Sequence, residues 1–182
     1  RRLSTGAYAY LKVAEGCNNP CTFCHIPAMR GQFRSRRIAD LVIEAKALEA
    51  QGVRELVLIA QDTTRYGEDL GIGHGLRTLI ESLLDATDIQ WIRFLYAYPA
   101  TLDEGLFELM ARQPRFLPYL DIPLQHASRK VLKAMKRGGD ATSYSRLIER
   151  ARATVPDIAL RTTFIVGFPG ETDDAVDGLA DF

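Results

Sequence analysis

All three cysteines of the chain lie close together, at Cys17, Cys21 and Cys24, in the spacing C-x3-C-x2-C. An odd number of cysteines packed this tightly argues against a framework of disulfide bonds. Thiolates are soft ligands that suit iron–sulfur clusters and zinc. The spacing therefore predicts a metal or redox site in a reducing compartment, and the rest of the chain must fold so as to position this site.

Three thiolates favour a four-iron cluster, because one iron then stays open for a small chelating molecule, whereas a structural metal site is normally closed by a fourth ligand. Zinc with His25 as fourth ligand is an alternative, although adjacent ligands such as Cys24 and His25 are awkward to bring round one tetrahedral ion. Residues Cys21 to His25 also match C-x-x-C-H, the attachment motif of c-type haem, but that chemistry is typical of exported proteins. Cysteines that are merely buried as small hydrophobic residues are a further alternative, which the polar loop around them disfavours.

The composition is that of an ordinary soluble domain, with 47% hydrophobic and 25% charged residues. The 182 residues are enough for one domain, spanning 1–182, with a substantial core. Lys plus Arg and Asp plus Glu are both 23, so the zero net charge gives no support for a broadly basic nucleic-acid surface. No apolar stretch of about 18 residues and no signal-peptide core is found, so we expect no membrane span and a cytoplasmic location.

Strand and helix patterns alternate along the chain. The run at 56–60 is apolar throughout, which is typical of a strand buried on both faces. Between the strands, apolar residues recur at helical spacing, and Thr101 with Glu104 is a candidate capping box. The predicted strands lie at 7–13, 56–60, 91–96, 119–122 and 158–166. This alternation predicts an α/β fold with a parallel sheet, in which ligands gather at the carboxyl ends of the strands.

Polar or glycine-rich segments follow several predicted strands. Gln61 and Asp62 follow the second strand and offer acceptor oxygens for an ammonium group, while the alternative for Asp62 is to cap a turn. Gln125 and His126 follow the fourth strand and can reach a ribose hydroxyl or the substrate; the alternative for His126 is a hydrogen-bonded structural role. Gly167 follows the fifth strand, where glycine permits close backbone approach.

Two side chains of the fifth predicted strand, Arg161 and Thr163, are also candidates to enter the site. A buried guanidinium without a partner is costly. Arg161 is therefore expected to meet a carboxylate, either that of a ligand or that of an acidic residue such as Asp121. Tyr98-Pro99, after the third strand, is a weak signal that loop packing also explains. The convergence of such segments at one edge of the sheet is what an active site requires.

The cysteine motif, with an aromatic residue before its last cysteine and a strand before it, resembles that of the radical SAM (S-adenosylmethionine) superfamily. The resemblance implies a partial (β/α)6 barrel, here truncated within its fifth βα unit. It also implies a [4Fe–4S] cluster on Cys17, Cys21 and Cys24, whose open iron chelates the methionine part of SAM. One-electron reduction would then cleave SAM to a 5′-deoxyadenosyl radical, which takes a hydrogen atom from the substrate. The residues expected to contact SAM are Phe23, Gln61, Asp62, Gln125, His126, Arg161, Thr163 and Gly167.

Longer strings are similar to those of the methylthiotransferase family, and the similarity covers nearly the whole chain. These strings lie at 15–18, 26–31, 120–128, 135–138 and 162–172. Ile-Pro-Ala-Met-Arg-Gly at 26–31, Gln-Asp-Thr at 61–63 and Gln-His-Ala-Ser at 125–128 resemble the RimO-like branch, which modifies an aspartate of a small-subunit ribosomal protein. The alternative is the MiaB-like branch, which modifies a tRNA adenosine and tends to Gln-Asn-Val and Gln-Ser-Gly-Ser at the last two strings.

The RimO-like resemblance implies hydrogen abstraction from the aspartate β-carbon, followed by addition of a methylated sulfur. SAM would serve as methyl donor and radical source, and an electron donor such as flavodoxin or ferredoxin would reduce the cluster. The family also carries an N-terminal methylthiotransferase domain with a second [4Fe–4S] cluster and a C-terminal TRAM-like domain, which we expect only in a full-length protein. No direct contact with nucleic acid is expected of this domain. A non-catalytic iron–sulfur or zinc binding module is the remaining alternative.

Overall fold

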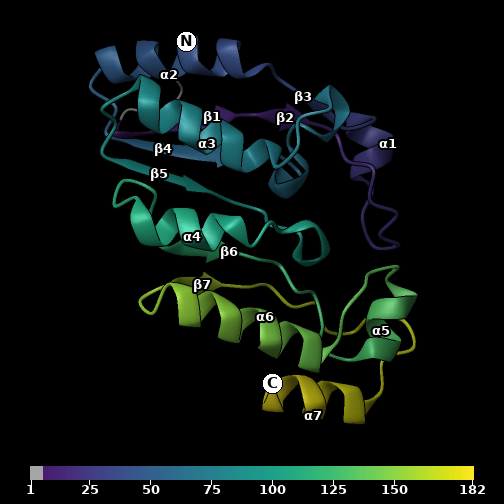
Figure 1. Cartoon of the computed structure of the whole chain (residues 1–182). Coiled ribbons are helices and arrows are strands. Elements are labelled where there is room, and N and C mark those ends of the chain that lie inside the picture. Colours follow the sequence, from purple (N-terminus) through teal and green to yellow (C-terminus); the bar gives the residue numbers. More distant parts are fainter. Residues whose placement is uncertain (1–5) are drawn as a thin grey trace.

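A computed structural model describes residues 6–182, and Figure 1 shows how strands and helices alternate along the chain. The strands are β1 (Tyr8–Lys12), β2 (Ala14–Glu15), β3 (Arg34–Ser35), β4 (Glu55–Ile59), β5 (Trp91–Phe94), β6 (Tyr119–Asp121) and β7 (Ala159–Arg161). The α-helices are α1 (Ile26–Arg30), α2 (Ile38–Ala50), α3 (Gly75–Ala86), α4 (Gly105–Arg112), α5 (Arg129–Ala134), α6 (Ala141–Thr154) and α7 (Asp173–Asp181). Short 3-10 helices lie at Thr63–Arg65, Glu68–Leu70 and Pro99–Thr101. None of the helices in this described part is long and apolar enough to span a membrane.

The main strands are parallel, as their alternation with helices predicted. β4 is the middle strand of a sheet with the order β1-β4-β5, and β6 pairs with β7. Between β5 and β6 the pairing is sparse: a parallel bridge joins Ile92 to Phe116, and the Ala97 N–H donates to the Asp121 carbonyl oxygen. The α/β prediction is confirmed, and within residues 6–182 the parallel strands form an open arrangement and not a closed barrel.

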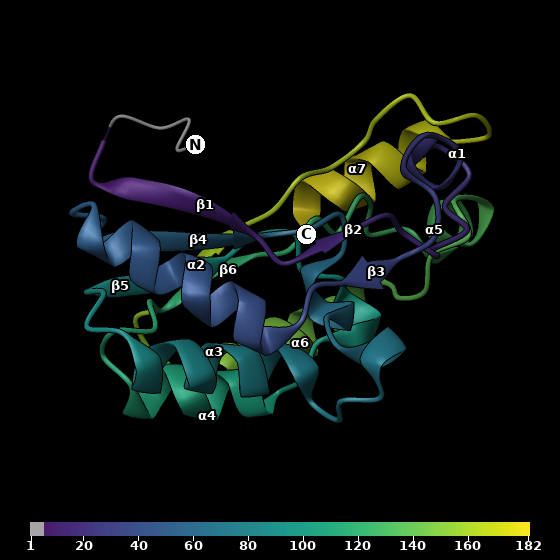
Figure 2. The ribbon, with the colours of Figure 1, turned by 90° about the horizontal axis from the view of Figure 1, so that it is seen from above.

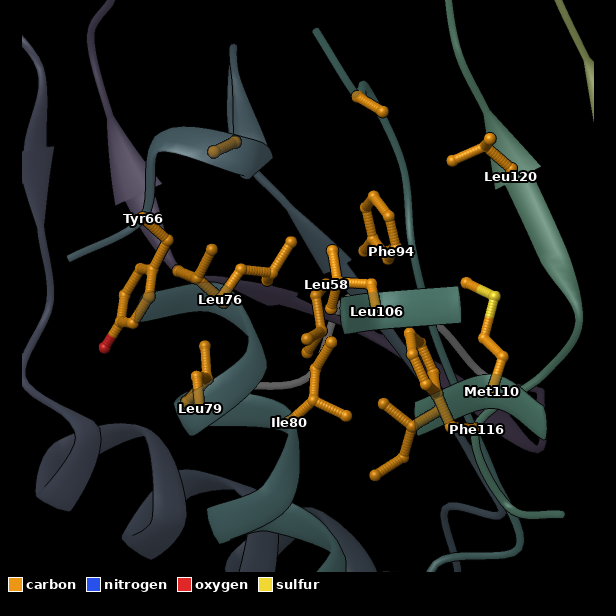
Figure 3. Packing of buried hydrophobic residues seen from close by; sticks show 14 of the residues in the cluster. Leu58, Tyr66, Leu76, Leu79, Ile80, Phe94, Leu106, Met110, Phe116 and Leu120 are labelled. Atoms are coloured by element: carbon orange, nitrogen blue, oxygen red, sulfur yellow. The ribbon is translucent and has the colours of Figure 1, made fainter. Parts of the chain in front are cut away.

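The core fills the space between the strands and the helices α2, α3 and α4, which lie on one side of them (Figure 2). Burial alternates along β1, so that Leu11 points into this core and its neighbours do not. Figure 3 shows Leu58 of β4 and Phe94 of β5 packed near Leu79 and Ile80 of α3. All four side chains are fully buried. Burial of side chains of this size contributes about 1.5–3 kcal/mol each, which fixes the strands and therefore the loops at their ends.

The other face of the strands is more polar. Tyr10 of β1 is exposed there, and Arg93 of β5 forms an ion pair with Glu55 of β4 at 2.7 Å. The Arg93 guanidinium also lies 5.2 Å from the centre of the Tyr119 ring. These side chains share one face because paired residues of neighbouring parallel strands point the same way. The hydrophobic core cluster thus lies on the helical side, while the middle strand β4 is buried on both faces, since Val57 on the polar face is also buried.

The strand predicted at 158–166 is shorter in the structure, and β7 ends at Arg161. Beyond it, the Gln125 N–H donates to the Thr163 carbonyl oxygen at 2.9 Å, and the Ile165 N–H donates to the Gln125 carbonyl oxygen at 2.7 Å. Gln125 adopts a φ of 72°, which no regular strand residue has. The regular ladder ends at the Asp121–Arg161 pair, and pairing resumes only as a bridge between Gln125 and Phe164. Three residues separate Asp121 from Gln125 but two separate Arg161 from Phe164, so the register is lost between the two pairs, and this segment becomes a loop of the site.

The predicted capping box of Thr101 and Glu104 is wrong. Thr101 ends a 3-10 helix, and its hydroxyl lies 2.8 Å from that of Thr64. α4 begins only at Gly105, and Glu104 provides no side-chain cap. The local sequence pattern failed because the Thr101 hydroxyl found a partner that is distant in the sequence. A capping box does occur at α6, where the Asp140 carboxylate accepts the Ser143 N–H.

This cap makes the stability of α6 depend on pH. The bond from the Ser143 N–H, helped by Arg129, lowers the pKa of Asp140 to about 2, against about 3.9 for an unfolded aspartate. The pKa of Asp140 is lower in the folded state than in the unfolded state. The stabilisation of the fold by the ionised Asp140 is therefore complete above about pH 4 and is lost as the pH falls toward about 2. We expect Asp140→Ala to lower the free energy of unfolding at neutral pH and to differ less from the wild type in acid. Urea unfolding measured across this range, with the exposed Asp157→Ala as control, tests it; a difference that stays constant with pH would contradict it.

Candidate functional site

A cavity of about 310 Å³ lies at the carboxyl ends of the strands, at the end of the molecule where Figure 1 shows α1 and α5. Its walls come from the cysteine loop and from the segments that follow β4, β5, β6 and β7, so the strand ends converge as the sequence predicted. The lining residues are Cys17, Asn19, Cys21, Phe23, Cys24, Ile26, Gln61, Asp62, Tyr96, Ala97, Tyr98, Pro123, Gln125, Arg137 and Thr163. Eight of the predicted site residues, namely the three cysteines, Phe23, Gln61, Asp62, Gln125 and Thr163, are brought together here.

The cysteine loop leaves the strands at Gly16, which adopts a φ of 80°. A Cβ atom at this position would collide with the carbonyl oxygen of Gln32, so both the conformation and the close approach require glycine. The Cys17 N–H then donates to the Gly31 carbonyl oxygen at 3.2 Å. The antiparallel pair β2–β3, which the sequence analysis missed, closes the base of this loop.

Hydrogen bonds hold the loop on two opposite sides. On one side, Thr22 donates its N–H to the Met135 carbonyl oxygen at 3.1 Å and its hydroxyl to the Ala134 carbonyl oxygen at 3.0 Å. These bonds dock the loop on the end of α5. On the other side, the Asn19 side-chain amide donates to the Asp62 carboxylate at 2.7 Å. The position of the cysteines therefore depends on both the turn after β4 and the end of α5.

N–H groups point at two of the three sulfurs. The Asn19 backbone N–H donates to the Cys17 sulfur at 3.4 Å, and the Arg137 guanidinium donates to the Cys21 sulfur at 3.7 Å. Cys17 is buried, and this burial raises the pKa of its thiol, while the Asn19 N–H opposes the rise. A thiol of this kind gives up its proton when a metal binds, and donors to the sulfur then stabilise the metal-bound thiolate.

This donor set fits a four-iron cluster. In a cubane each thiolate binds its own iron, so three cysteines need only line one cavity, whereas zinc needs its ligands to converge on one ion. Within residues 6–182, no group of three or more His, Cys, Asp or Glu side chains converges in that way. His25, the fourth ligand of the zinc alternative, is exposed at the start of α1. Three thiolates that line one cavity are therefore a donor set that fits a cluster ligated by Cys17, Cys21 and Cys24.

Gln61 presents an acceptor at the cavity. Its side-chain Oε1 is buried and has no hydrogen-bond partner among the described residues. A buried acceptor left in this state costs about 1–3 kcal/mol, a cost that a ligand donor would remove. An amino group entering the cavity beside the cysteines is such a donor.

Asp62 is 2% exposed, and both of its carboxylate oxygens have partners. One accepts the Thr64 hydroxyl at 2.6 Å and the other accepts the Asn19 amide. Burial raises the pKa of Asp62, and these two hydrogen bonds oppose the rise. The Asn19 amide oxygen in turn accepts from Arg65 at 3.2 Å. The contacts that Asp62 makes in the structure thus position the cysteine loop, while its predicted contact with SAM remains a prediction.

His126 does not line the cavity, and its contact with SAM stays a prediction. It is fully buried, and both ring nitrogens have partners: Nδ1 accepts the Ser128 N–H at 2.9 Å, and Nε2 lies 2.6 Å from the Glu171 carboxylate. Glu171 also accepts the Gly167 N–H. Burial raises the pKa of Glu171, but the bonds from His126 and Gly167 outweigh it and hold that pKa below its ordinary value. The structural alternative for His126 therefore describes the observed contacts, which join the loop after β6 to the loop after β7.

Arg161 and Gly167 also lie outside the cavity lining. Arg161 forms an ion pair with Asp121 at 3.5 Å and lines a separate hollow of about 230 Å³ on the polar face of the sheet. Asp121 is 1% exposed, so it needs such a partner, and its other oxygen accepts the Tyr96 N–H at 3.1 Å. The carboxylate that Arg161 was expected to meet is thus the protein's own. Gly167 is exposed, with a φ of 79°, and braces Glu171 through its N–H.

Several cavity residues were not predicted from the sequence, among them Asn19, Tyr96 and Arg137. Tyr98 was noted only as a weak signal. Asn19 lies between Cys17 and Cys21, so its position in the cysteine loop could have predicted that it lines the cavity. Arg137 follows α5 and not a strand, so the strand-end rule gave no reason to select it.

The sequence is similar to known proteins along its whole length. The model of the radical SAM superfamily matches residues 11–182. The protein named ribosomal protein uS12 methylthiotransferase RimO of Koribacter versatilis is 51% identical over 183 residues, which is 100% of this chain and 36% of that protein. The protein of the same name from Solibacter usitatus is 52% identical over 177 residues, 96% of this chain and 38% of that protein. The chain thus spans less than two fifths of the length of these curated relatives.

Solved structures show the same fold at low sequence identity. The radical S-adenosylmethionine methyltransferase TsrM of Kitasatospora setae, with a tryptophan substrate and a SAM analogue bound, has a TM-score of 0.75 and 21% identity, over 96% of this chain and 33% of that chain. The cobalamin-dependent S-adenosylmethionine radical enzyme OxsB has a TM-score of 0.70 and 14% identity, over 94% of this chain and 26% of that chain. At these identities the likeness concerns the fold alone.

The anchoring role of Asp62 can be tested by substitution. Asp62→Ala removes the acceptor of the Asn19 amide, and we expect the free energy of unfolding to fall by about 1–3 kcal/mol. We also expect faster proteolysis in the cysteine loop. Urea unfolding and limited proteolysis measure the two effects, with Glu68→Ala as control, because the exposed Arg65–Glu68 ion pair is worth at most about 1 kcal/mol. Equal behaviour of the two variants would refute this role.

Proposed function

The chain belongs to the radical SAM superfamily, and we propose that it is the radical SAM core of a methylthiotransferase that acts on an aspartate of a small-subunit ribosomal protein. The observation that carries the proposal is the meeting of three cysteines with the unpartnered Gln61 acceptor around one cavity at the strand ends. Three thiolates leave one iron of a [4Fe–4S] cluster open for SAM. The name that the curated relatives share supports the choice of substrate.

In this proposal Cys17, Cys21 and Cys24 hold the cluster, and the loop contacts described above keep them in place. When bound, the cluster supplies the electron that cleaves SAM, which yields the radical that takes a hydrogen atom from the substrate. Gln61 accepts a hydrogen bond from the amino group of SAM through its otherwise unpartnered oxygen. A bond to a charged donor of this kind is worth about 1.5–3 kcal/mol.

The remaining cavity residues position SAM and keep water out. Gln125 and Thr163 supply polar groups to the cavity, and such groups suit ribose hydroxyls. Their backbones are bonded to each other, so the two move as one unit. Phe23, Ile26 and Tyr98 give the cavity apolar walls that limit access of water to the reacting atoms.

The choice of a ribosomal protein over tRNA rests on the strings at 26–31, 61–63 and 125–128 and on the curated relatives. The zero net charge agrees with it, because a tRNA-binding surface gains from basic residues. We propose that a small electron carrier such as flavodoxin or ferredoxin reduces the cluster, that the domain makes no direct contact with nucleic acid, and that the protein acts in the cytoplasm. A second [4Fe–4S] cluster belongs, in this proposal, to a full-length protein.

The cluster can be tested by anaerobic reconstitution with iron and sulfide. We expect about four irons per chain and formation of 5′-deoxyadenosine when SAM and dithionite are added. Alanine at Cys17, Cys21 or Cys24 should abolish both, since none of the three thiolates has a substitute in this chain. Metal analysis and chromatography of the products are the measurements.

His25→Ala is the matched control for this experiment. His25 is the fourth ligand in the zinc alternative and the axial ligand in the haem alternative, but it takes no part in the proposed cluster. The variant should therefore retain its iron and its cleavage of SAM. Stoichiometric zinc in the wild type, or four irons without cleavage of SAM even in a full-length parent protein, would replace the proposal with a non-catalytic binding module.

The substrate requires a separate assay. A full-length parent that carries this core should methylthiolate the aspartate of the ribosomal protein and leave tRNA adenosine unchanged, as judged by mass spectrometry of both. The 182 residues alone should cleave SAM without completing methylthiolation, because the second cluster that delivers the sulfur is expected outside them. Modified tRNA from the parent would assign the MiaB-like activity, and methylthiolated product from the 182 residues alone would contradict the need for a second cluster.

A further inference from the structure

Within the described residues, the cationic side chain of Arg137 contacts a cysteine sulfur. One guanidinium nitrogen donates to the Cys21 sulfur at 3.7 Å, and another donates to the Pro123 carbonyl oxygen at 2.9 Å. The guanidinium carbon lies 4.3 Å from the centre of the Tyr98 ring. This side chain therefore places a permanent positive charge beside one ligand of the proposed cluster.

The position of Arg137 is fixed by its surroundings. Its backbone N–H donates to the Leu132 carbonyl oxygen at 2.8 Å, which ties it to the end of α5. Directly after it, the Gly138 carbonyl oxygen accepts the Tyr144 hydroxyl at 2.8 Å. Gly139 has a φ of 108° and lies so close to the Tyr144 ring that a Cβ atom would collide with it. These backbone, carbonyl and ring contacts hold the guanidinium in place already, so no conformational entropy is lost in ordering it when the cluster assembles or changes charge.

We propose that Arg137 is a positioning residue that raises the reduction potential of the [4Fe–4S] cluster through the Cys21 sulfur. The inference rests on the proposed function. Three thiolates and an oxidised cubane core carry one net negative charge, and addition of one electron makes two. A nearby cation stabilises the more negative state more strongly, and an N–H bond to the sulfur acts in the same direction. The reduced cluster is the state that must donate an electron to SAM, so the cation makes this state accessible to a cellular reductant.

Among residues 6–182, no other charged side chain donates a hydrogen bond to the Cys21 sulfur. The Arg65 guanidinium is directed to the Asn19 amide oxygen and to the Glu68 carboxylate. The buried Asp62 is the nearby anion of the cavity, and an anion acts in the opposite sense. The local charge at Cys21 is therefore set by Arg137 more than by any other side chain of the described residues.

The test is a redox titration of the reconstituted chain without SAM, in which electron paramagnetic resonance measures the reduced cluster. We expect Arg137→Gln to lower the ratio of reduced to oxidised cluster about tenfold at a given potential, which corresponds to about 59 mV for one electron. Arg137→Lys keeps the charge but loses the planar contact, so its reduction potential should lie between those of the wild type and Arg137→Gln. Lys133→Gln removes an equal charge from the exposed face of α5 and should leave the potential unchanged.

The outcomes separate this inference from the proposed function. A wild-type chain without a four-iron cluster would end the proposed function and this inference with it. A wild-type potential in Arg137→Gln, or an equal drop in Lys133→Gln, would overturn this inference alone. A variant that keeps its potential but binds SAM more weakly would also overturn it, because Arg137 would then be a SAM contact.

A second variant covers the case in which Arg137→Gln fails to hold a cluster. Tyr98→Leu removes the ring on which the guanidinium lies and leaves the charge on the chain. We expect its potential to fall in the same direction and by less than tenfold in the ratio of reduced to oxidised cluster. Unchanged potentials in both Tyr98→Leu and Arg137→Lys would overturn the inference.

Discussion

The attachment of the cysteine loop to two other βα units is the constraint on which the rest of the site depends. Asn19 binds the buried carboxylate of Asp62 after β4, and Thr22 binds the backbone at the end of α5. Because the two anchors belong to different βα units, the cavity exists only when the packed core has fixed those units relative to each other.

Buried charge explains which polar residues brace the site and which line its cavity. The carboxylates of Asp121 and Glu171 are nearly inaccessible to water, so each requires a cationic or N–H partner inside the protein. Arg161 and His126 meet that need, and these pairs tie neighbouring strand ends and loops together. The unpaired oxygen of Gln61 and the cysteine sulfurs remain directed to the cavity. The groups left available for a cofactor are therefore those that are not already paired with another buried group of the protein.

The strands have a helical face and a more polar face, and the cavity lies at their carboxyl ends. The helices α2, α3 and α4 cover one face of the strands and build the core there (Figure 2). The other face carries Tyr10 and the Arg93–Glu55 pair, which tolerate contact with water. The core thus lies between the strands and the helices and the cavity at the strand ends, so the loops that line the cavity can carry polar residues without loss of the hydrophobic core.

The sequence by itself determined the α/β alternation, the cysteine site and five further residues of the cavity, because periodicity and ligand spacing are local properties. It also offered the correct partner for Arg161 as one of two alternatives. Only the tertiary structure decided that the β6–β7 ladder ends at Asp121 and Arg161, that Thr101 binds Thr64 in place of capping α4, and that the His126 ring is paired with Glu171. The same is true of Arg137, which reaches Cys21 across 116 residues of sequence. These contacts join segments far apart in the chain, and their partners are chosen by packing, which no local pattern encodes.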